Sequence, residues 1–462
     1  MSDYIADPTG PDAAPIESLD QLIEHFERGA TPPTEYLIGT EYEKVVVDRE
    51  TGAAIPFSGA RGIERVLRDL ADRFGWEPQE EDGHVIGLSR PGGEITLEPG
   101  GQLELSGRAC STLHEAQVEL DEHVNEVTVV AEPLGIEFLS LGIQPFSKLD
   151  EIEWVPKKRY GIMAPYMQKV GTYGQRMMKQ TATVQVNLDY ESEADALKKM
   201  RISTGLAPVM NAIFANSSVC DGAPNGFLSF RGQIWTDTDP DRCGMLPFVF
   251  SDQAGFEDYC DWALDAPMYF VKRGSVYHDL TGVRFRDFWK NGVGELRATV
   301  GDFALHLSTL FPETRLKTYI ELRMADSQPP DSMLALSALS KGVLYENDCM
   351  EGAWDLVKGW TFEERVQILH ETYREGFRAT AKRHKMGDLA HELVEIAAEG
   401  LRRQDCRNAS GDTEEIYLDT VRDRVMRRVT LAEEFLQKWE SHSGDDDRQW
   451  LMDYAAYRNP AA

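Results

Sequence analysis

Cysteine is scarce in this sequence, and none of the six cysteines is spaced from another as C-x-x-C. The spacing therefore indicates neither a structural zinc site nor a thioredoxin-like dithiol. So few thiols in a chain of 462 residues are typical of a reducing compartment, where disulfides are rare. The cysteines are Cys110, Cys220, Cys243, Cys260, Cys349 and Cys406.

Long apolar runs are also missing. No stretch approaches the roughly 18 apolar residues of a membrane span. The nearest, GLAPVMNAIFANSSV, is interrupted by Pro208, Asn211 and Asn216. The acidic N-terminus, MSDYIADPTGPDAAP, has no apolar region of the kind that signal peptides contain. We expect a cytoplasmic protein with no membrane partner and no transit peptide.

Several nucleotide and metal motifs are absent. No GxxxxGK[ST] loop occurs, and no GxGxxG follows a predicted strand, so neither a P-loop nor a dinucleotide-binding fold is indicated. The segment HELVE at 391–395 lacks the second histidine of a zinc-protease HExxH motif. If the protein uses a nucleotide or a metal, it holds them by other means.

Positive charge is in short supply. The chain has 48 Lys and Arg against 78 Asp and Glu, a net charge of −30. Such a surface repels the phosphates of nucleic acids and anionic lipids, so we expect no nucleic-acid partner. Most of the acid is explained by solubility, including solubility in a salty cytoplasm.

Apolar periodicity and turn residues divide the chain into helices and strands. Capping boxes open several helical stretches, for example Thr112 with Glu115. The stretch GEITLEPGGQLELSG (93–107) alternates on both sides of Pro-Gly-Gly and predicts a β-hairpin. We expect further strands at 36–48, 180–190 and 317–326, and helices at 18–29, 62–75, 112–135, 195–218, 361–384 and within 414–441.

These elements favour an α+β fold. Strands dominate the middle of the chain and do not alternate with single helices, which indicates a largely antiparallel sheet rather than a doubly wound one. No Gly/Ser-rich or Pro-rich linker divides the chain. We expect a single catalytic domain over 1–462, with an N-terminal helix and tail (1–34), a sheet-bearing core (35–330) and a helical C-terminal part (331–462).

Polar side chains share faces on the predicted strands. Alternation places Glu41 with Glu43, Gln102 with Glu104, and Glu321 with Arg323. The ordinary explanation is an antiparallel sheet with one face in water. However, glutamates on neighbouring strands repel one another unless cations lie among them, and Mg²⁺ prefers carboxylate and phosphate oxygens. A third such face carries Thr183, Gln185 and Asn187.

Arginines supply the complementary charge. Arg159, Arg231 and Arg323 lie in or beside these polar segments. Arginine binds carboxylate or phosphate through two parallel hydrogen bonds, which suits phosphoryl transfer. Each of them is equally compatible with an ordinary surface ion pair.

Six segments together resemble a known family: IGTEYEK, LEPGGQLELSG, VPKKRYGIMAPYM, GTYGQRMMKQTATVQVNLDY, PNGFLSFRGQIWTDTDPDRCGMLPFVF and VGELRATVGDFALHLSTLFPETRLKTYIELRMAD. In this order and spacing they resemble glutamate–cysteine ligase of the plant and proteobacterial type. The resemblance runs from about residue 35 to the C-terminal helices.

The resemblance implies a glutamine-synthetase-like fold, in which a curved antiparallel sheet forms a funnel surrounded by helices. It implies that ATP phosphorylates the γ-carboxylate of glutamate, and that the amine of cysteine then displaces phosphate to give γ-glutamylcysteine, the first step of glutathione synthesis. Two or three Mg²⁺ ions would bridge ATP and the protein. The small-molecule substrates would thus be glutamate, cysteine and ATP, and the enzyme a monomer or homodimer.

The same resemblance suggests roles for individual residues. Metal ligands would be Glu41, Glu43, Glu104 and Glu321, with Glu98 as a neighbour. Arg323 and Glu104 would act in catalysis, and Arg323 with Lys179 would bind ATP. Substrate binding would fall to Arg159, Arg231, Thr183, Gln185 and Asn187.

Two other functions stay open on sequence grounds. A related ligase could join glutamate to a different amine, because the phosphorylation half-reaction would be the same. A non-catalytic relative could bind glutamate or nucleotide without turnover.

Overall fold

The computed structural model describes residues 13–441 and 447–458. Its centre is a nine-stranded sheet with the strand order β14-β15-β7-β1-β5-β4-β3-β2, and β6 pairs with one end of β1. Every pairing within this sheet is antiparallel. The strands are β1 (Ile38–Asp48), β2 (Glu77–Glu81), β3 (His84–Arg90), β4 (Gly93–Leu97), β5 (Leu103–Ser106), β6 (Ile136–Leu139), β7 (Thr183–Leu188), β14 (Thr314–Leu316) and β15 (Ile320–Asp326).

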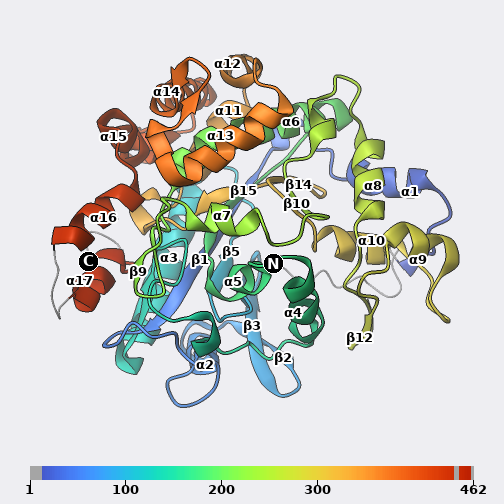
Figure 1. Cartoon of the computed structure of the whole chain (residues 1–462), viewed down its shortest axis with the longest axis horizontal. Helices are drawn as coiled ribbons and strands as arrows, with labels where there is room; N and C mark the ends of the chain where they lie inside the picture. The colour runs from blue at the N-terminus through green and yellow to red at the C-terminus, as the bar shows by residue number, and fades with distance from the viewer. Residues whose placement is uncertain (1–12, 442–446, 459–462) are drawn as a thin grey trace.

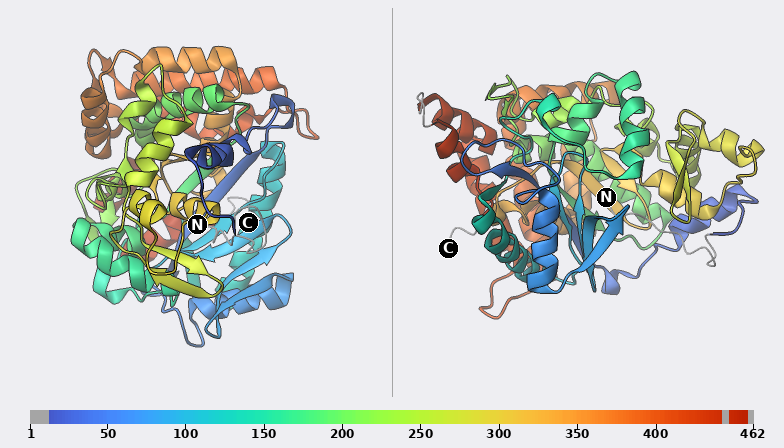
Figure 2. Two further views of the ribbon diagram at one scale, coloured as in Figure 1. Left: turned by 90° about the vertical axis from the view of Figure 1, so that its right-hand side faces the viewer. Right: turned by 90° about the horizontal axis from the view of Figure 1, so that it is seen from below.

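Helices from distant parts of the chain cover this sheet (Figure 1). Among them, α6 packs on β15 and α11 on β7, while α13 and α14 pack outside α6. In Figure 2 the helices of the C-terminal third, drawn in orange and red, lie together at one side of the sheet. Helix α6 spans Glu193–Phe214, and the helices of the C-terminal third include α11 (Ala335–Leu344), α12 (Asn347–Val357), α13 (Phe362–Glu375), α14 (Met386–Gln404), α15 (Asp419–Arg427) and α16 (Leu431–Ser441).

The remaining helices lie around the other parts of the sheet or beyond it, where α1 packs on α8 and α10, and α8 on α9. Of those in the described ranges, α2 packs on β3 and α3 on β6. No helix in these ranges is both long and apolar enough to cross a membrane. The remaining helices are α1 (Leu19–Glu27), α2 (Ile63–Phe74), α3 (Leu113–Ala131), α4 (Lys158–Val170), α5 (Gly174–Gln180), α7 (Phe230–Trp235), α8 (Phe256–Asp265), α9 (Phe285–Asn291), α10 (Val300–Leu307) and α17 (Asp447–Ala455).

The expected elements are present, with two corrections. The helix predicted over 361–384 ends at Glu375, because Gly376 adopts a positive φ of 51°. The residues beyond it form the short hairpin of β16 (Thr380–Ala381) and β17 (His384–Lys385). The helical stretch 414–441 is divided at Arg428, which also has a positive φ, and restarts at the cap Thr430.

The predicted alternation of faces is correct, and the ordinary explanation of the polar faces, contact with water, does not hold for β1. Tyr42 packs in the main hydrophobic core, whereas Glu41 and Glu43 face a pocket on the other side of β1. Both faces of β1 are buried along almost its whole length. The polar face is therefore enclosed by other elements, so its glutamates need another explanation than contact with water.

Candidate functional site

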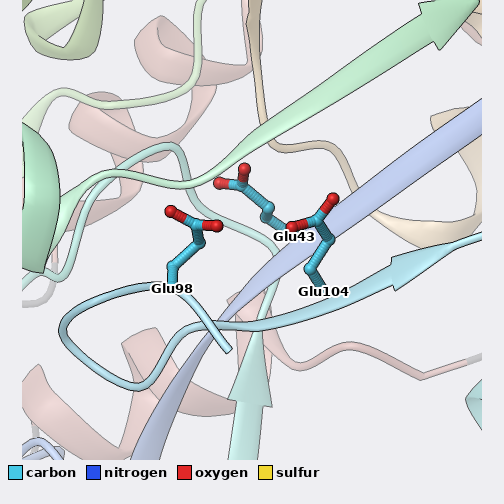
Figure 3. A group of neighbouring side chains, drawn as sticks. All are labelled: Glu43, Glu98 and Glu104. Carbon is cyan, nitrogen blue, oxygen red and sulfur yellow. The ribbon is translucent and has the colours of Figure 1, made fainter. Parts of the chain in front are cut away.

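Three carboxylates converge at the middle of the sheet. One oxygen from each of Glu43, Glu98 and Glu104 lies within 4.8 Å of the other two. Figure 3 shows the side chains pointing toward one another, from β1, from the hairpin turn and from β5. Three such oxygens at this spacing offer hard ligands to a divalent cation.

The hairpin that contains LEPGGQLELSG builds this cluster. Pairing of β1 with β5 sets Glu43 directly opposite Glu104. The turn between β4 and β5 is closed by hydrogen bonds from the Glu98 amide to the Gln102 carbonyl and from the Gly101 amide to the Glu98 carbonyl, both 2.9 Å. Gly101 has a φ of +87°, which favours glycine, and this turn carries Glu98 to the other two glutamates.

Hydrogen bonds fix two of the three carboxylates. Glu104 is fully buried and accepts hydrogen bonds from Thr96 Oγ1 (3.0 Å) and Ser106 Oγ (3.1 Å). Glu43 accepts one from the Thr183 amide (3.0 Å). Burial, followed by the nearby Glu98 and Glu104 carboxylates, raises the pKa of Glu43 well above its usual value. A bound cation would relieve this repulsion.

Glu41 lies one pleat away on the same face of β1. Its carboxylate accepts hydrogen bonds from Gln185 Nε2 (2.8 Å) and Asn187 Nδ2 (3.1 Å) on β7. Burial, then the Glu321 and Glu104 carboxylates, raises the pKa of Glu41. Glu41 thus extends the acidic face from the three-carboxylate cluster toward β15.

Glu321 differs from the other glutamates because cations surround it. It is fully buried, with Arg315 Nε at 2.5 Å, Arg323 Nη1 at 3.0 Å and Lys317 Nζ at 3.5 Å from its oxygens. Burial would raise its pKa, but the Arg315, Lys317 and Arg323 cations hold the pKa of Glu321 well below its usual range. Glu321 is therefore already neutralised by the protein.

A pocket opens over these strands, and both glutamates and arginines line it. Arg159 comes from α4, Arg231 from α7 and Arg323 from β15. Arg323 donates to Gln185 Oε1 and to Glu321, and Arg231 donates to the Arg323 carbonyl (3.0 Å). The pocket is lined by Glu41, Glu43, Glu98, Pro99, Arg159, Tyr160, Met163, Met177, Met178, Thr181, Thr183, Gln185, Arg231, Trp235, Phe311, Arg315 and Arg323.

Most residues proposed from the sequence meet at this pocket. Thr183 and Gln185 line it, and Asn187 donates a hydrogen bond to Glu41, which also lines it. Lys179 does not belong to the lining: its Nζ donates to the Leu149 carbonyl (2.6 Å) and lies over the Trp154 ring. A role for Lys179 at the nucleotide stays a prediction.

Several pocket residues were missed by sequence reasoning. Arg315 is one of them, although the hairpin of β14 and β15 pairs it directly with Glu321, a register that the spacing of the two residues could have indicated. The apolar lining residues Met163, Trp235 and Phe311 gave no signal, because each comes from a segment that long-range folding alone brings to the sheet.

Comparisons with known proteins agree with this geometry. The model of the family described as "Glutamate-cysteine ligase family 2" matches residues 37–450. The chloroplastic glutamate–cysteine ligase of Medicago truncatula is 43% identical over 434 residues, covering 92% of this chain and 83% of that protein. The one from Arabidopsis thaliana is 42% identical over 429 residues, covering 92% and 80%.

A solved structure shares the fold. Glutamate–cysteine ligase from Francisella tularensis, in complex with AMP, superposes with a TM-score of 0.57 at 13% identity, covering 91% of this chain and 87% of that one. Such low identity shows the fold alone. The α+β, glutamine-synthetase-like fold with a mostly antiparallel sheet, as expected from the sequence, is thereby confirmed.

Proposed function

The chain belongs to the glutamate–cysteine ligase family 2, and from this membership we infer that it joins the γ-carboxylate of L-glutamate to the amine of L-cysteine at the expense of ATP. The product would be γ-glutamylcysteine, the first intermediate of glutathione synthesis. The observation that carries this proposal is a pocket lined by Glu41, Glu43, Glu98 and four arginines, next to the point where Glu43, Glu98 and Glu104 converge.

The chemistry requires fixed positive charge beside the carboxylates. Attack of the glutamate γ-carboxylate on the γ-phosphate of ATP brings two anions together, and their repulsion raises the barrier. Fixed positive groups lower that barrier most when they are held in place before the reaction and shielded from water. The buried Arg231 and the nearly buried Arg323 meet both conditions.

We propose Mg²⁺ as the cation of the acidic side. Glu43, Glu98 and Glu104 fit one ion by their spacing, and Glu41 would add a ligand beside them. Two or three ions could be accommodated along this face if Glu321 also contributes. When bound, Mg²⁺ would offset the charge of the ATP phosphates and of the carboxylates.

The arginines would orient the anionic substrates. Arg159 and Arg231 would bind the carboxylates of glutamate, and Arg323 the phosphates of ATP. Thr183, Gln185 and Asn187 would shape the space between them, with Lys179 as a more distant contact for ATP. Arg323 would act on the reacting groups directly, and Glu104 would act through the cation that it holds. Holding three substrates in one orientation supplies the proximity part of the rate enhancement.

A phosphate-release assay tests the function. The purified protein would be given ATP, Mg²⁺, L-glutamate and one amine from a panel that contains L-cysteine, L-serine, 2-aminobutyrate and glycine. We expect release that depends on glutamate and is fastest with cysteine. Equal rates with all amines would point to a ligase with another acceptor, and no release with any of them would favour a non-catalytic relative.

The location and assembly of the protein remain predictions. The plant relatives are named chloroplastic, so the cytoplasmic location expected from the sequence has no support from them. A monomer or homodimer is expected, and sedimentation of the purified protein would decide between them.

A further inference from the structure

One buried carboxylate beside the pocket has no part in the chemistry proposed above. Asp326 is the last residue of β15 and is fully buried. Its Oδ2 accepts hydrogen bonds from the Asn216 amide (2.8 Å) and Ser217 Oγ (2.7 Å), and its Oδ1 accepts one from Ser229 Oγ (3.0 Å). Asp326 therefore ties two separate serines to the end of a central strand.

Both serines also accept hydrogen bonds from the backbone of α7. Ser217 Oγ accepts a hydrogen bond from the Arg231 amide (3.0 Å), and Ser229 Oγ accepts one from the Gly232 amide (3.2 Å). Each hydroxyl thus donates to Asp326 and accepts from the first turn of α7, the element that carries Arg231. The backbone of Arg231 is held to the sheet through Asp326.

The charge of Asp326 acts on the same arginine. Burial lowers the pKa of Arg231, and the Asp326 carboxylate is the foremost group that opposes this effect, followed by Glu43. Burial likewise raises the pKa of Asp326, and Arg231 is the foremost group that opposes it. Each side chain therefore stabilises the charged form of the other in a buried setting.

The neighbouring backbone leaves room for this carboxylate. A Cβ atom on Gly142 would lie 2.6 Å from Asp326 Cβ, which is closer than side chains tolerate. Gly142 donates to the Asn216 carbonyl (2.9 Å) and accepts from the Ala182 amide (3.0 Å), so its backbone cannot move away freely. The space in which Asp326 lies depends on a glycine at this position.

We propose that Asp326 is a positioning residue that fixes Arg231 for the carboxylate of substrate glutamate. The proposal rests on the function inferred above, in which Arg231 binds glutamate. Asp326 acts on the substrate indirectly, through Ser217, Ser229 and the backbone of α7. Its loss should therefore weaken glutamate binding more than ATP binding or the chemical step.

The test compares steady-state kinetics of the wild-type protein and Asp326→Asn, which keeps the shape and removes the charge. We expect the KM for glutamate to rise about 10-fold to 100-fold, as for other residues that orient a binding group. The KM for ATP and kcat should stay within about threefold. The interaction that is lost would stabilise bound glutamate equally in the ground state and in the transition state, so its loss raises the KM and leaves kcat unchanged. Calorimetric titration of glutamate in the presence of Mg²⁺ and a non-hydrolysable ATP analogue should show the same loss of affinity.

Ser217→Ala provides a second, milder variant. It leaves the charge of Asp326 in place and removes the acceptor of the Arg231 amide together with one donor to Asp326, so the KM for glutamate should rise about fivefold. If Asp326→Asn does not fold, this variant decides the question. The matched control is Glu414→Gln, which alters another fully buried carboxylate that accepts from the Leu113 amide and Lys341 Nζ, both 2.6 Å, away from the pocket.

The control should lose thermal stability and keep its KM for glutamate within twofold. The proposal is overturned if neither Asp326→Asn nor Ser217→Ala changes the affinity for glutamate, or if Glu414→Gln changes it as much. A wild-type protein that neither binds nor uses glutamate would instead overturn the proposed function and this inference together. Normal wild-type turnover with unaltered variants would overturn the inference alone.

Discussion

Glutamates of the pocket fall into two kinds, although they lie on neighbouring strands. Glu321 is enclosed by Arg315, Arg323 and Lys317, and its pKa is held well below the usual range despite burial. Glu43 faces Glu98 and Glu104 instead, and its pKa is raised. The protein thus surrounds Glu321 with its own cations, whereas at Glu43 burial and the neighbouring carboxylates outweigh the attraction of Arg231. The Glu43 cluster is for this reason the best-supported Mg²⁺ site.

The first prediction concerns that cluster. We expect Glu43→Gln to weaken Mg²⁺ binding by at least about 10-fold, because one of three convergent ligands loses its charge. Without Mg²⁺, the variant should melt at the same temperature as the wild type or higher, since repulsion among the carboxylates is reduced. Melting temperatures measured across a Mg²⁺ titration check both points.

A matched control is Glu94→Gln, on β4 of the same hairpin but outside the cluster and the pocket lining. Its response to Mg²⁺ should equal that of the wild type. If Glu43→Gln responds to Mg²⁺ as strongly as Glu94→Gln does, the assignment of this site is wrong.

A second prediction at the residue scale concerns His306, which is buried in α10 and contacts the Ala263 carbonyl through Nε2 (2.8 Å). Burial, and then Arg242, lowers the pKa of His306 from 6.5 to about 3. The unfolded chain therefore takes up a proton near pH 6.5 while the folded protein does not. The stability contributed by this residue is complete above pH 6.5 and is lost as the pH falls toward 3.

Replacing His306 with glutamine removes this titration. Between pH 7 and pH 5 the wild type should lose about 2 kcal/mol of unfolding free energy relative to His306→Gln, from the linkage of one proton. Urea unfolding at several pH values measures this difference. Parallel curves for the two proteins over that range would show that His306 does not remain neutral in the fold.

At the scale of elements, two helices of the layer over the sheet meet backbone to backbone. A Cβ atom on Gly400 of α14 would lie 1.8 Å from the Gly342 carbonyl oxygen of α11, and one on Gly342 would lie 2.2 Å from the Ala397 oxygen. No rotamer change relieves a clash with backbone atoms, so the two helices can approach this closely only with glycine at the crossing. Because α11 also packs on β7, this crossing supports the strand that carries Gln185.

The third prediction follows from this crossing. Gly400→Ala should destabilise the protein by about 1–3 kcal/mol, because the inserted methyl group overpacks the contact and outweighs the better helix propensity of alanine. Gly352→Ala in α12 is the control: its Cβ would make an ordinary contact at 3.6 Å with Ile396. The control should be neutral or stabilising by up to about 1 kcal/mol in chemical denaturation. Equal effects of the two substitutions would argue against the close crossing.

Elements were predictable from the sequence where local patterns decide them. The Pro-Gly-Gly hairpin and the alternation of Glu41, Tyr42 and Glu43 appear in the structure as expected. The capping box of α3 is half formed: Thr112 accepts from the Glu115 amide, but Glu115 accepts from the Ser111 amide instead of that of Thr112. The break at Gly376 was missed because helical periodicity continues beyond it, and only the positive φ of this glycine ends α13. Local propensity thus located the elements better than it located their ends.

The candidate site was predictable in composition rather than in arrangement. Strand parity grouped Glu41 with Glu43, but the approach of Glu98 depends on how the hairpin turn lies against β1. The polar face of β1 borders a pocket that residues of α4, α5 and α7 also line, an arrangement that no strand pattern reveals. Asp326 is a further case, because its partners Ser217 and Ser229 are about a hundred residues away in sequence.

At the scale of the whole molecule, the net charge of −30 lies mostly outside the site. Within the pocket, carboxylates and arginines are close to balance. On the surface, many arginines of the C-terminal helices pair with acids, as Arg402 does with Glu415 and Arg427 with Glu434. Acidic residues nevertheless outnumber basic ones by 30. These ion pairs therefore do not remove the net repulsion among the surface carboxylates.

The last prediction is that salt stabilises this protein. Screening weakens both attraction and repulsion, but exposed ion pairs contribute little individually, whereas the repulsion of a large net charge is summed over the whole surface. The melting temperature should therefore rise as KCl increases. Most of the rise should come below about 0.3 M, since the Debye length falls by about 22 Å between 0.01 M and 0.15 M and by only about 5 Å more up to 1 M. A rise that continues in a straight line to 1 M KCl would indicate exclusion of salt from the surface instead. A fall would show that the ion pairs outweigh the net charge.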